Sequence, residues 1–332
     1  MNDAGEFLEG TKGPYRSPAD YILGITHEIW ESRQIEKIYD YYSPDTLIFT
    51  LGGLVRGSEA IVQNTRDTLA AFPDRLLLSD AVIWSREGPG AFYSSHRIVS
   101  PMTHLGDHVW SSATGRKVQV TTVADCVVKE GVIVREWLVR DNWALAMQMG
   151  LDPAAIARSQ AKSEPAADFA AWLQAELSRV ERGAPSGHPV AHDDWHGFAD
   201  RALRNAWVVG DVACFEAHYA PYAVLHESQP VASGCAAIQR HFEALRACWQ
   251  GASMCVDHVC ARPTEPGAWD VAVRWGFVGI HSDEFLGVAA TGAKFFVLGV
   301  THWRIVAGRV AAEWTLFDKL ALATQLLRPS NS

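Results

Sequence analysis

The residues best suited to chemistry are two aspartates, Asp141 and Asp318, at equivalent places in two similar stretches of the chain. The two stretches read EWLVRDNWALAMQ and EWTLFDKLALATQ. Each aspartate follows a tryptophan by four residues, Trp137 in the first stretch and Trp314 in the second. Side chains four positions apart on a strand share a face, so each aspartate is expected beside its tryptophan. If that face is concave and apolar, it raises the carboxyl pKa and makes the aspartate an acid or base near neutral pH.

A second interpretation gives the same two aspartates a structural role. Each one ends a predicted strand and precedes a short closing helix, which is a favoured position for a helix N-cap. There a carboxylate accepts hydrogen bonds from backbone N–H groups of the first helical turn. The two interpretations are compatible, and the sequence leaves both open for Asp141 and Asp318.

Two histidines, His104 and His281, also occupy equivalent positions on predicted strands. A neutral imidazole can orient a ligand carbonyl or share a proton with the nearby aspartate. A strand-end histidine bonded to the backbone is the structural alternative. The sequence does not choose between these roles.

The two copies differ in charge along one strand face. The second copy has His302 and Arg304 there, where the first copy has Asp125 and Val127. Arg304 can pair with Asp318 or hold a ligand carboxylate, and a structural salt bridge is the plainer alternative. Two pockets of different charge need not accept the same ligand.

These candidate residues belong to a tandem repeat. An offset of 177 residues aligns the two aspartates and most of the remaining chain without a gap. This spacing is too long for a solenoid unit, so each copy is expected to be a whole domain. The predicted boundaries are 17–150 for the first domain, 151–192 for a partly helical linker and 193–328 for the second domain.

Each copy is predicted to begin with helices and to continue as a sheet. Apolar residues at helical spacing predict helices over 18–33 and 58–71 in the first copy. Stretches rich in Val, Ile and aromatic residues, separated by turns that contain Gly, predict strands at 76–85, 91–103, 117–129 and 132–141. Helices followed by an antiparallel sheet indicate the α+β fold class.

The order of elements and several motifs resemble the SnoaL-like polyketide cyclases of the nuclear transport factor 2-like superfamily. The second copy carries the resemblance in His281, Thr291–Gly292, Arg304, Gly308, Trp314, Asp318 and Gln325–Leu326. The first copy keeps most of these residues but has Val127 in place of the arginine. The resemblance implies two tandem cone-shaped α+β barrels, each a curved antiparallel sheet wrapped around helices with an apolar pocket at its open end.

The resemblance also implies a function. In the cyclases, an aspartate at this place is the acid/base of an intramolecular aldol closure that needs no metal or cofactor. Asp318, His281, Asp141 and His104 are therefore the candidate catalytic residues, acting on a small, apolar, polyketide-like carbonyl compound by cyclisation, isomerisation or dehydration. The same superfamily contains non-catalytic domains, so a small-ligand-binding or interaction module is the alternative.

Candidate substrate-binding residues follow from the same resemblance. They are Arg304, His302, His226, Trp314, Trp137 and Asp125. Many family members place a histidine at the mouth of the pocket, where the second copy has His226 and the first has Phe49. The second copy is therefore favoured as the active one.

Composition limits the partners and the compartment. A net charge of −9 without a basic run argues against nucleic-acid binding. No apolar stretch approaches the roughly 20 residues of a membrane span. The acidic N-terminus lacks the apolar core of a signal peptide, which predicts a cytoplasmic protein.

No metal site is expected, and the oligomeric state is left open. The six cysteines follow no CxxC spacing. His188, His192 and His196 recur every four residues, but Pro189 favours a loop over a ligating helix. Members of this fold often pair through the outer sheet face, so the two repeats are expected to form a pseudo-dimer within one chain.

Overall fold

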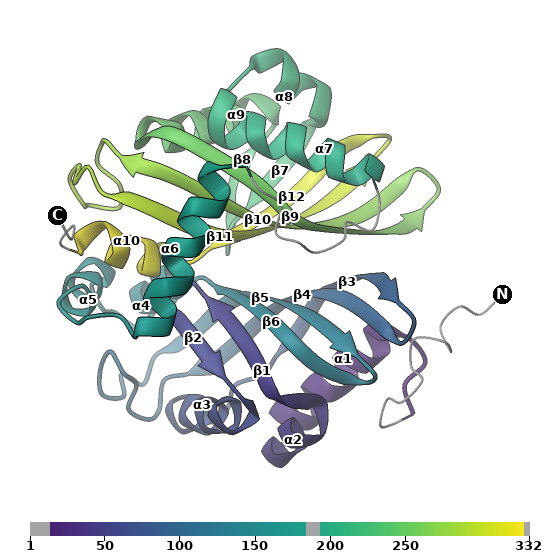
Figure 1. Cartoon of the computed structure of the whole chain (residues 1–332), viewed down its shortest axis with the longest axis vertical. Helices are drawn as coiled ribbons and strands as arrows, with labels where there is room; N and C mark the ends of the chain where they lie inside the picture. Colours follow the sequence, from purple (N-terminus) through teal and green to yellow (C-terminus); the bar gives the residue numbers. More distant parts are fainter. Residues whose placement is uncertain (1–13, 184–192, 329–332) are drawn as a thin grey trace. The chain divides into compact units, whose positions relative to one another are not determined.

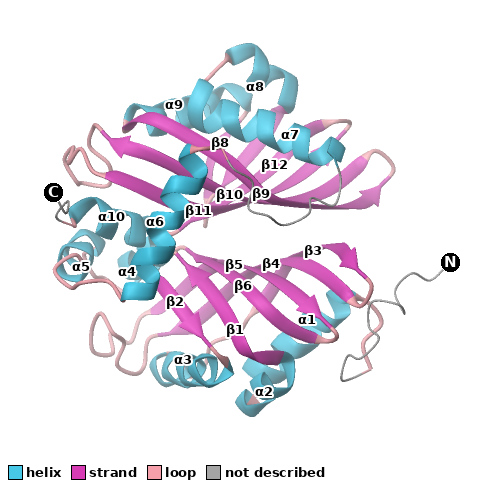
Figure 2. Cartoon of the chain, viewed as in Figure 1, coloured by secondary structure: helices cyan, strands magenta, loops and turns pink. Residues whose placement is uncertain are grey.

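The computed structural model describes residues 14–183 and 193–328, and the chain divides into two compact units at Asp152 and Pro153. Each unit is an α+β domain with one six-stranded sheet (Figures 1 and 2). The acidic N-terminus, the loop predicted at Pro189 and two of the spaced histidines, His188 and His192, lie outside the described residues. The compartment and that loop therefore stay predictions.

The first domain follows the predicted order of elements. Its helices are α1 (Pro18–Thr26), which continues as a π-helical turn (His27–Glu31), a 3-10 turn (Ile35–Lys37), α2 (Ile38–Tyr41), α3 (Ser58–Ala71) and α4 (Asn142–Gln148). Its strands are β1 (Tyr42–Thr50), β2 (Gly53–Arg56), β3 (Leu78–Gly88), β4 (Ala91–Thr103), β5 (Lys117–Lys129) and β6 (Val132–Arg140). Helices α1 to α3 lie against one face of the sheet (Figure 1). We call this the inner face.

The sheet of the first domain is mixed rather than wholly antiparallel. The strand order is β2-β1-β6-β5-β4-β3, and only the β1–β6 pairing is parallel. Local sequence explains the tight hairpin between β5 and β6, where Glu130 and Gly131 both have positive φ. Ala307 and Gly308 repeat that turn in the second domain. Two successive residues of positive φ match the right-handed twist of the flanking strands.

The second domain repeats the same elements and adds two helices before them. The additions are α5 (Pro153–Gln160) and α6 (Ala167–Glu181). The remaining helices are α7 (Asp193–Arg204), a π-helical turn (Asn205–Val209), α8 (Val212–His218), α9 (Cys235–Ala247) and α10 (Lys319–Leu327). The strands are β7 (Tyr219–His226), β8 (Pro230–Ser233), β9 (Trp249–Glu265), β10 (Ala268–His281), β11 (Lys294–Val306) and β12 (Arg309–Phe317), in the order β8-β7-β12-β11-β10-β9.

Helix α6, predicted as part of a linker, packs on the outer face of the second sheet. Arg179 forms an ion pair of 2.9 Å with buried Asp257 of β9, and Trp172 meets Phe296 of β11 edge-on. Gly276 leaves room for Val180, whose side chain lies 2.9 Å from the position a Cβ would take. The predicted linker therefore supplies structure to the second domain. With 15 residues, α6 is the longest described helix and is too short to cross a lipid bilayer.

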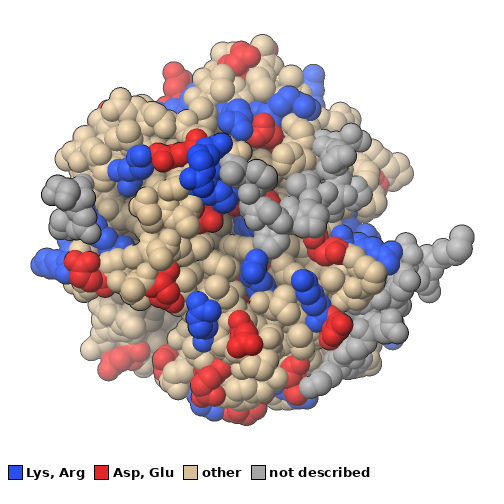
Figure 3. Space-filling model, viewed as in Figure 1, with Lys and Arg blue, Asp and Glu red and all other residues tan. Residues whose placement is uncertain are grey.

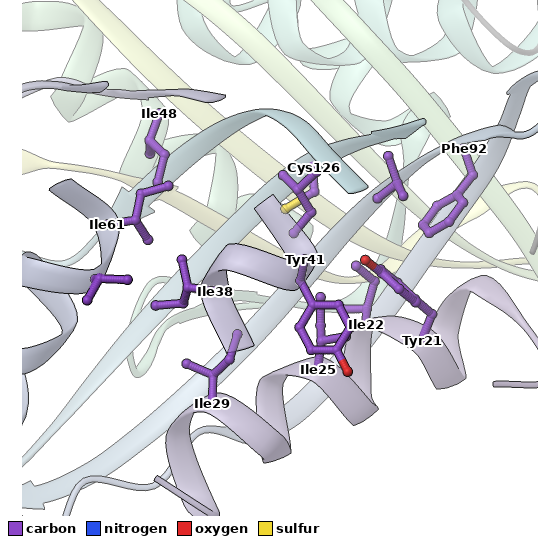
Figure 4. Close-up of a cluster of buried hydrophobic side chains, with 13 residues drawn as sticks. Tyr21, Ile22, Ile25, Ile29, Ile38, Tyr41, Ile48, Ile61, Phe92 and Cys126 are labelled. Atoms are coloured by element: carbon purple, nitrogen blue, oxygen red, sulfur yellow. The ribbon is translucent and has the colours of Figure 1, made fainter. Parts of the chain in front are cut away.

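The interiors of the two domains are built from different residues. The inner face of the first domain packs aliphatic side chains from α1, α2 and α3 against the sheet (Figure 4). In the second domain, Trp207 packs against Trp275 and Phe317 with ring centroids 4.7 and 5.6 Å apart. A Cβ at Gly299 would lie 2.2 Å from the Trp275 ring, so only glycine admits this indole. Packing in the interior of the second domain therefore depends on a glycine at position 299 beside the Trp275 ring.

We predict that Gly299→Ala destabilises the protein by about 1–3 kcal/mol, because the added methyl group overpacks a filled interior. Gly53→Ala is the matched control, since no atom lies within 4 Å of its Cβ position. Urea unfolding of both variants measures the difference. Equal stability of the two variants would contradict the proposed contact.

Candidate active site

The inner face of the first domain encloses a cavity of about 410 Å³. Its walls are largely aliphatic and come from α1, α2, α3 and the sheet. The aliphatic lining residues include Ile22, Ile25, Ile29, Ile38, Ile48, Ile61, Ile98, Ile133 and Leu138. Several of these side chains point into the space between α1 and the strands in Figure 4. A volume of this size lies in the range of about 300–1,000 Å³ that is common for small-molecule sites.

Glu136 on β6 supplies the buried carboxyl group of this apolar wall, whereas Asp67 and Asp107, which also line the cavity, are exposed. Tyr42 donates a hydrogen bond of 3.0 Å to Glu136 Oε2, and no other described residue hydrogen-bonds to the carboxyl. Burial raises the pKa of Glu136 to about 7, against the lowering effects of Tyr42 and Arg140. The group is therefore poised to gain or lose a proton near neutral pH.

Two uncharged polar groups face the same cavity. Burial lowers the pKa of His96 to about 4, so its imidazole is neutral at pH 7. His96 Nε2 and Thr122 Oγ1 are both buried without a hydrogen-bond partner among the described residues. Buried polar atoms left unpaired are costly, and a ligand oxygen or hydroxyl would satisfy them.

The cavity also has basic and aromatic groups. Arg75 stacks on Trp30 at 4.8 Å and is nearly completely buried. Burial lowers the pKa of Arg75 to about 9, with a further contribution from Arg140. Burial likewise lowers the pKa of His108 to about 4, and its ring packs on Trp110 at 4.5 Å. The site thus combines two neutral histidines, two guanidinium groups and the buried Glu136 carboxyl, with the exposed carboxylates of Asp67 and Asp107 also on its lining.

Both predicted catalytic aspartates are helix N-caps. Asp141 accepts a hydrogen bond of 3.0 Å from Ala144 N at the start of α4. Asp318 accepts bonds of 3.1 Å from Leu320 N and Ala321 N at the start of α10. Asp141 is not among the residues that line the cavity. The geometry agrees with the structural interpretation, and a catalytic role for either aspartate stays a prediction.

The predicted histidine pair holds two equivalent loops. His104 Nδ1 lies 3.0 Å from Thr114 Oγ1 and accepts a bond of 3.2 Å from Thr114 N. His281 makes the same contacts to Thr291, at 3.0 and 3.3 Å. Because Nδ1 is an acceptor, each neutral ring carries its proton on Nε2, which is buried without a hydrogen bond among the described residues. Burial lowers the pKa of both rings.

The remaining predicted residues lie on the outer sheet faces, away from the cavity. Trp137 stacks on Phe49 at 5.6 Å, and Trp314 stacks on His226 at 5.1 Å. Side chains alternate along β6, and the inner face takes Glu136, Leu138 and Arg140. The face of Trp137 and Asp141 is therefore the outer one, so the condition set for a pocket aspartate is not met.

Outer-face charges are paired within the sheet. Asp125 accepts hydrogen bonds from Tyr93 and Ser95, and all three side chains are buried. Arg304 pairs with Asp270 of β10 through two contacts of 2.5 and 3.1 Å, rather than with Asp318. The plainer alternative for Arg304, a structural salt bridge, is thus the one observed. His302 is buried on β11 opposite Trp314.

The second domain fills the positions that line the cavity in the first. The equivalents of Ile98, Cys126 and Arg140 are Trp275, Trp303 and Phe317, all nearly inaccessible to solvent. A hollow of about 610 Å³ occurs elsewhere in this domain, but its walls are mainly exposed residues such as Arg240 and Arg309. This geometry therefore favours the first copy as the active one and does not support the expectation that the second copy is active.

Sequence reasoning missed Glu136 and His96. The sequence contains a sign of the glutamate, because a Glu precedes the repeated Trp in both copies, as Glu136 and Glu313. Period two puts it on the face opposite the aspartate. No comparable signal marks His96, whose equivalent in the second copy is Val273.

A curved sheet closed over helices, present twice, defines a tandem protein of α+β cones. The SnoaL-like polyketide cyclase family matches residues 21–149 and, separately, 198–326. The chain belongs to this family, and its two copies confirm the repeat inferred from the sequence. No protein among those with curated descriptions matches the chain significantly.

Solved structures resemble one copy at a time. IdmH from Streptomyces antibioticus, described as a candidate polyketide cyclase, is 24% identical with a TM-score of 0.36. The match covers 40% of this chain and 99% of IdmH. AclR from Streptomyces galilaeus, described as a candidate hydroxylase, is 23% identical with a TM-score of 0.36, covering 40% of this chain and 94% of AclR.

We predict that Asp141→Ala and Asp318→Ala each destabilise the protein by about 1 kcal/mol, because each removes a cap. The Asp→Asn variants should retain most of the stability, since asparagine caps equally well. Thermal unfolding compares the four variants. Equal loss in the Ala and Asn variants would show that charge rather than capping matters.

We predict that Glu136→Gln changes how stability depends on pH. An unfolded glutamate loses its proton near pH 4.5, whereas the folded one keeps it until about pH 7. As the pH rises from 4.5 to 7, the free energy of unfolding of the wild type should therefore fall relative to that of the variant by about 3 kcal/mol. His96 and His108 are present in both proteins and cancel in the difference. Urea unfolding from pH 4 to 8 measures it, and a flat difference would show that Glu136 has an ordinary pKa.

Proposed function

We propose that the first domain is a cofactor-independent enzyme that binds a small, apolar, polyketide-like carbonyl compound and cyclises, isomerises or dehydrates it. The observation that carries the proposal is the cavity of about 410 Å³, whose largely aliphatic wall bears the buried groups Glu136, His96, Thr122 and Arg75. Apolar walls supply the affinity for a hydrocarbon body, and few converging polar groups supply its orientation. Family membership supports the same reaction class.

The polar groups suit proton transfer at a carbonyl compound. A carboxyl with a pKa near 7 is present in both protonation states at neutral pH, as a general acid or base requires. Neutral His96 and Thr122 offer an N–H and an O–H to a carbonyl or enolate oxygen. The proposed reaction uses these side chains alone.

A small-ligand-binding role is the second candidate, and one observation favours it. The aspartates that correspond to the family's acid/base cap helices, as expected of a binding module. The second domain fits a purely structural role, because aromatic side chains occupy its interior. On the face shown in Figure 3, acidic and basic side chains are interspersed, without a continuous basic surface. The exclusion of nucleic acids and the pseudo-dimer stay predictions.

Copying the interior of the second domain into the first should abolish ligand binding. The variant Ile98→Trp/Thr122→Gly/Ala124→Thr recreates Trp275, Gly299 and Thr301, whose hydroxyl accepts the Trp275 indole N–H at 3.0 Å. Isothermal titration with 2-tetralone, a bicyclic ketone, is the measurement. We expect saturable binding to the wild type and at least about tenfold weaker binding to the variant, or about 1.4 kcal/mol.

Leu105→Trp is the matched control, since it adds an indole at a half-exposed position that does not line the cavity. Ala124→Leu, which narrows the cavity with a smaller change, is the second test if the triple variant unfolds. Undiminished binding by a folded cavity-filling variant would place the ligand elsewhere. No binding of apolar ketones to the wild type would remove the basis of the proposal.

A further inference from the structure

The two domains contain the same glutamate in two different environments. In the second domain, Glu313 accepts hydrogen bonds from Tyr219 Oη at 2.5 Å, Trp303 Nε1 at 3.0 Å and Thr315 Oγ1 at 2.5 Å. Its side chain is completely buried. Three donors directed at one carboxylate make Glu313 a fully satisfied acceptor that fixes β12 against β7 and β11.

The first domain retains one of these three donors. Tyr42, the equivalent of Tyr219, donates to Glu136 Oε2. Cys126 and Leu138 stand where the second domain has Trp303 and Thr315, and neither supplies a comparable donor. Glu136 Oε1 therefore has no hydrogen-bond partner among the described residues, and the residue lines the cavity. The loss of two donors and the presence of a cavity occur at the same carboxyl.

We propose that Glu136 is the proton-transfer residue of the first domain, whereas Glu313 is a structural acceptor with no part in catalysis. The inference rests on the proposed function of the first domain and names the group that performs its chemistry. The comparison of the two domains carries the inference. Glu313 accepts three hydrogen bonds in the domain whose interior is filled, whereas the equivalent Glu136 accepts one and lines the cavity of the other domain. Burial, which raises the pKa of Glu136, is consistent with the role.

The proposed step balances without any other reactant. The Glu136 carboxylate takes a proton from the carbon next to the substrate carbonyl, and the C–H electron pair becomes the C=C bond of an enolate. The carbonyl π pair moves to oxygen, where the His96 N–H donates to the negative charge. If the substrate has a C=C bond conjugated with the enolate, return of the proton to the γ-carbon of this dienolate gives an isomer. Attack of the enolate carbon on a second carbonyl gives a ring, and Glu136 then protonates the new alkoxide.

Charged and titratable groups around Glu136 come from three strands. Tyr42 on β1 and Arg140 on β6 favour the carboxylate, while Asp125 on β5 disfavours it. The Cys126 thiol on β5 lies opposite Glu136 and, with its pKa raised well above the usual value by burial, is neutral at pH 7. Among these groups, Tyr42 is the one whose removal changes a direct hydrogen bond to Glu136.

Exchange of the α-hydrogens of 2-tetralone for deuterium, followed by NMR in D2O, tests the inference on the full chain. We expect the wild type to accelerate exchange over buffer, with an apparent pKa near 7 in the rate profile. Glu136→Gln should lower kcat by about 100-fold or more and leave the KM within about threefold. Glu265→Gln, the same change at an exposed position of the second domain, is the matched control and should leave both values unchanged.

Tyr42→Phe supplies an independent readout if Glu136→Gln unfolds. Because the Tyr42 hydrogen bond lowers the pKa of Glu136, its removal should move the pH profile of exchange to higher pH. A folded Glu136→Gln variant with wild-type kcat, or a Tyr42→Phe profile that does not move, overturns the inference. Binding of 2-tetralone without accelerated exchange overturns it and leaves the binding site in place. Absence of binding removes the proposed function itself.

Discussion

The volume between a curved sheet and the helices it wraps must be either filled by side chains or left as a cavity. Each sheet here places every second residue of four long strands toward that volume, so a few positions decide the result. The first domain has Ile98, Thr122 and Cys126 there, and a cavity remains. The second has tryptophan at two of the equivalent positions, and large aromatic side chains occupy its interior. The presence of a site and its chemistry follow from that choice.

Features set by local sequence were predictable. Helix α3 spans the predicted residues, as do strands β4 and β5, because hydrophobic periodicity and glycine turns are short-range signals. The N-cap interpretation of Asp141 was available for the same reason. The repeat was also visible, since it needs only a comparison of the chain with itself. Pairing of β1 with β6 in parallel was not, because strand order is a long-range property.

The site was harder to predict because period two gives two faces without saying which one is concave. The repeated Trp137 and Asp141 lie on the outer face, whereas Glu136 lies on the inner one. A cavity remains when the space between the sheet and the helices exceeds the summed volume of the side chains that point into it. Because that difference depends on many side chains, no single residue predicts it. Likewise, the composition of α6 suggested a connector, and only its contact with Asp257 shows that it belongs to the second domain.

The contact between Trp275 and Gly299 restricts the order in which the two copies can have diverged. An indole at position 275 requires a neighbour without a Cβ, because that atom would lie 2.2 Å from the ring. Starting from an ancestor with threonine at the facing site, glycine must come first, since it merely enlarges a void, whereas tryptophan arriving first collides with the opposing strand. From such an ancestor the two replacements are compatible with folding in one order only, and a return to a hollow interior would have to reverse them in the opposite order.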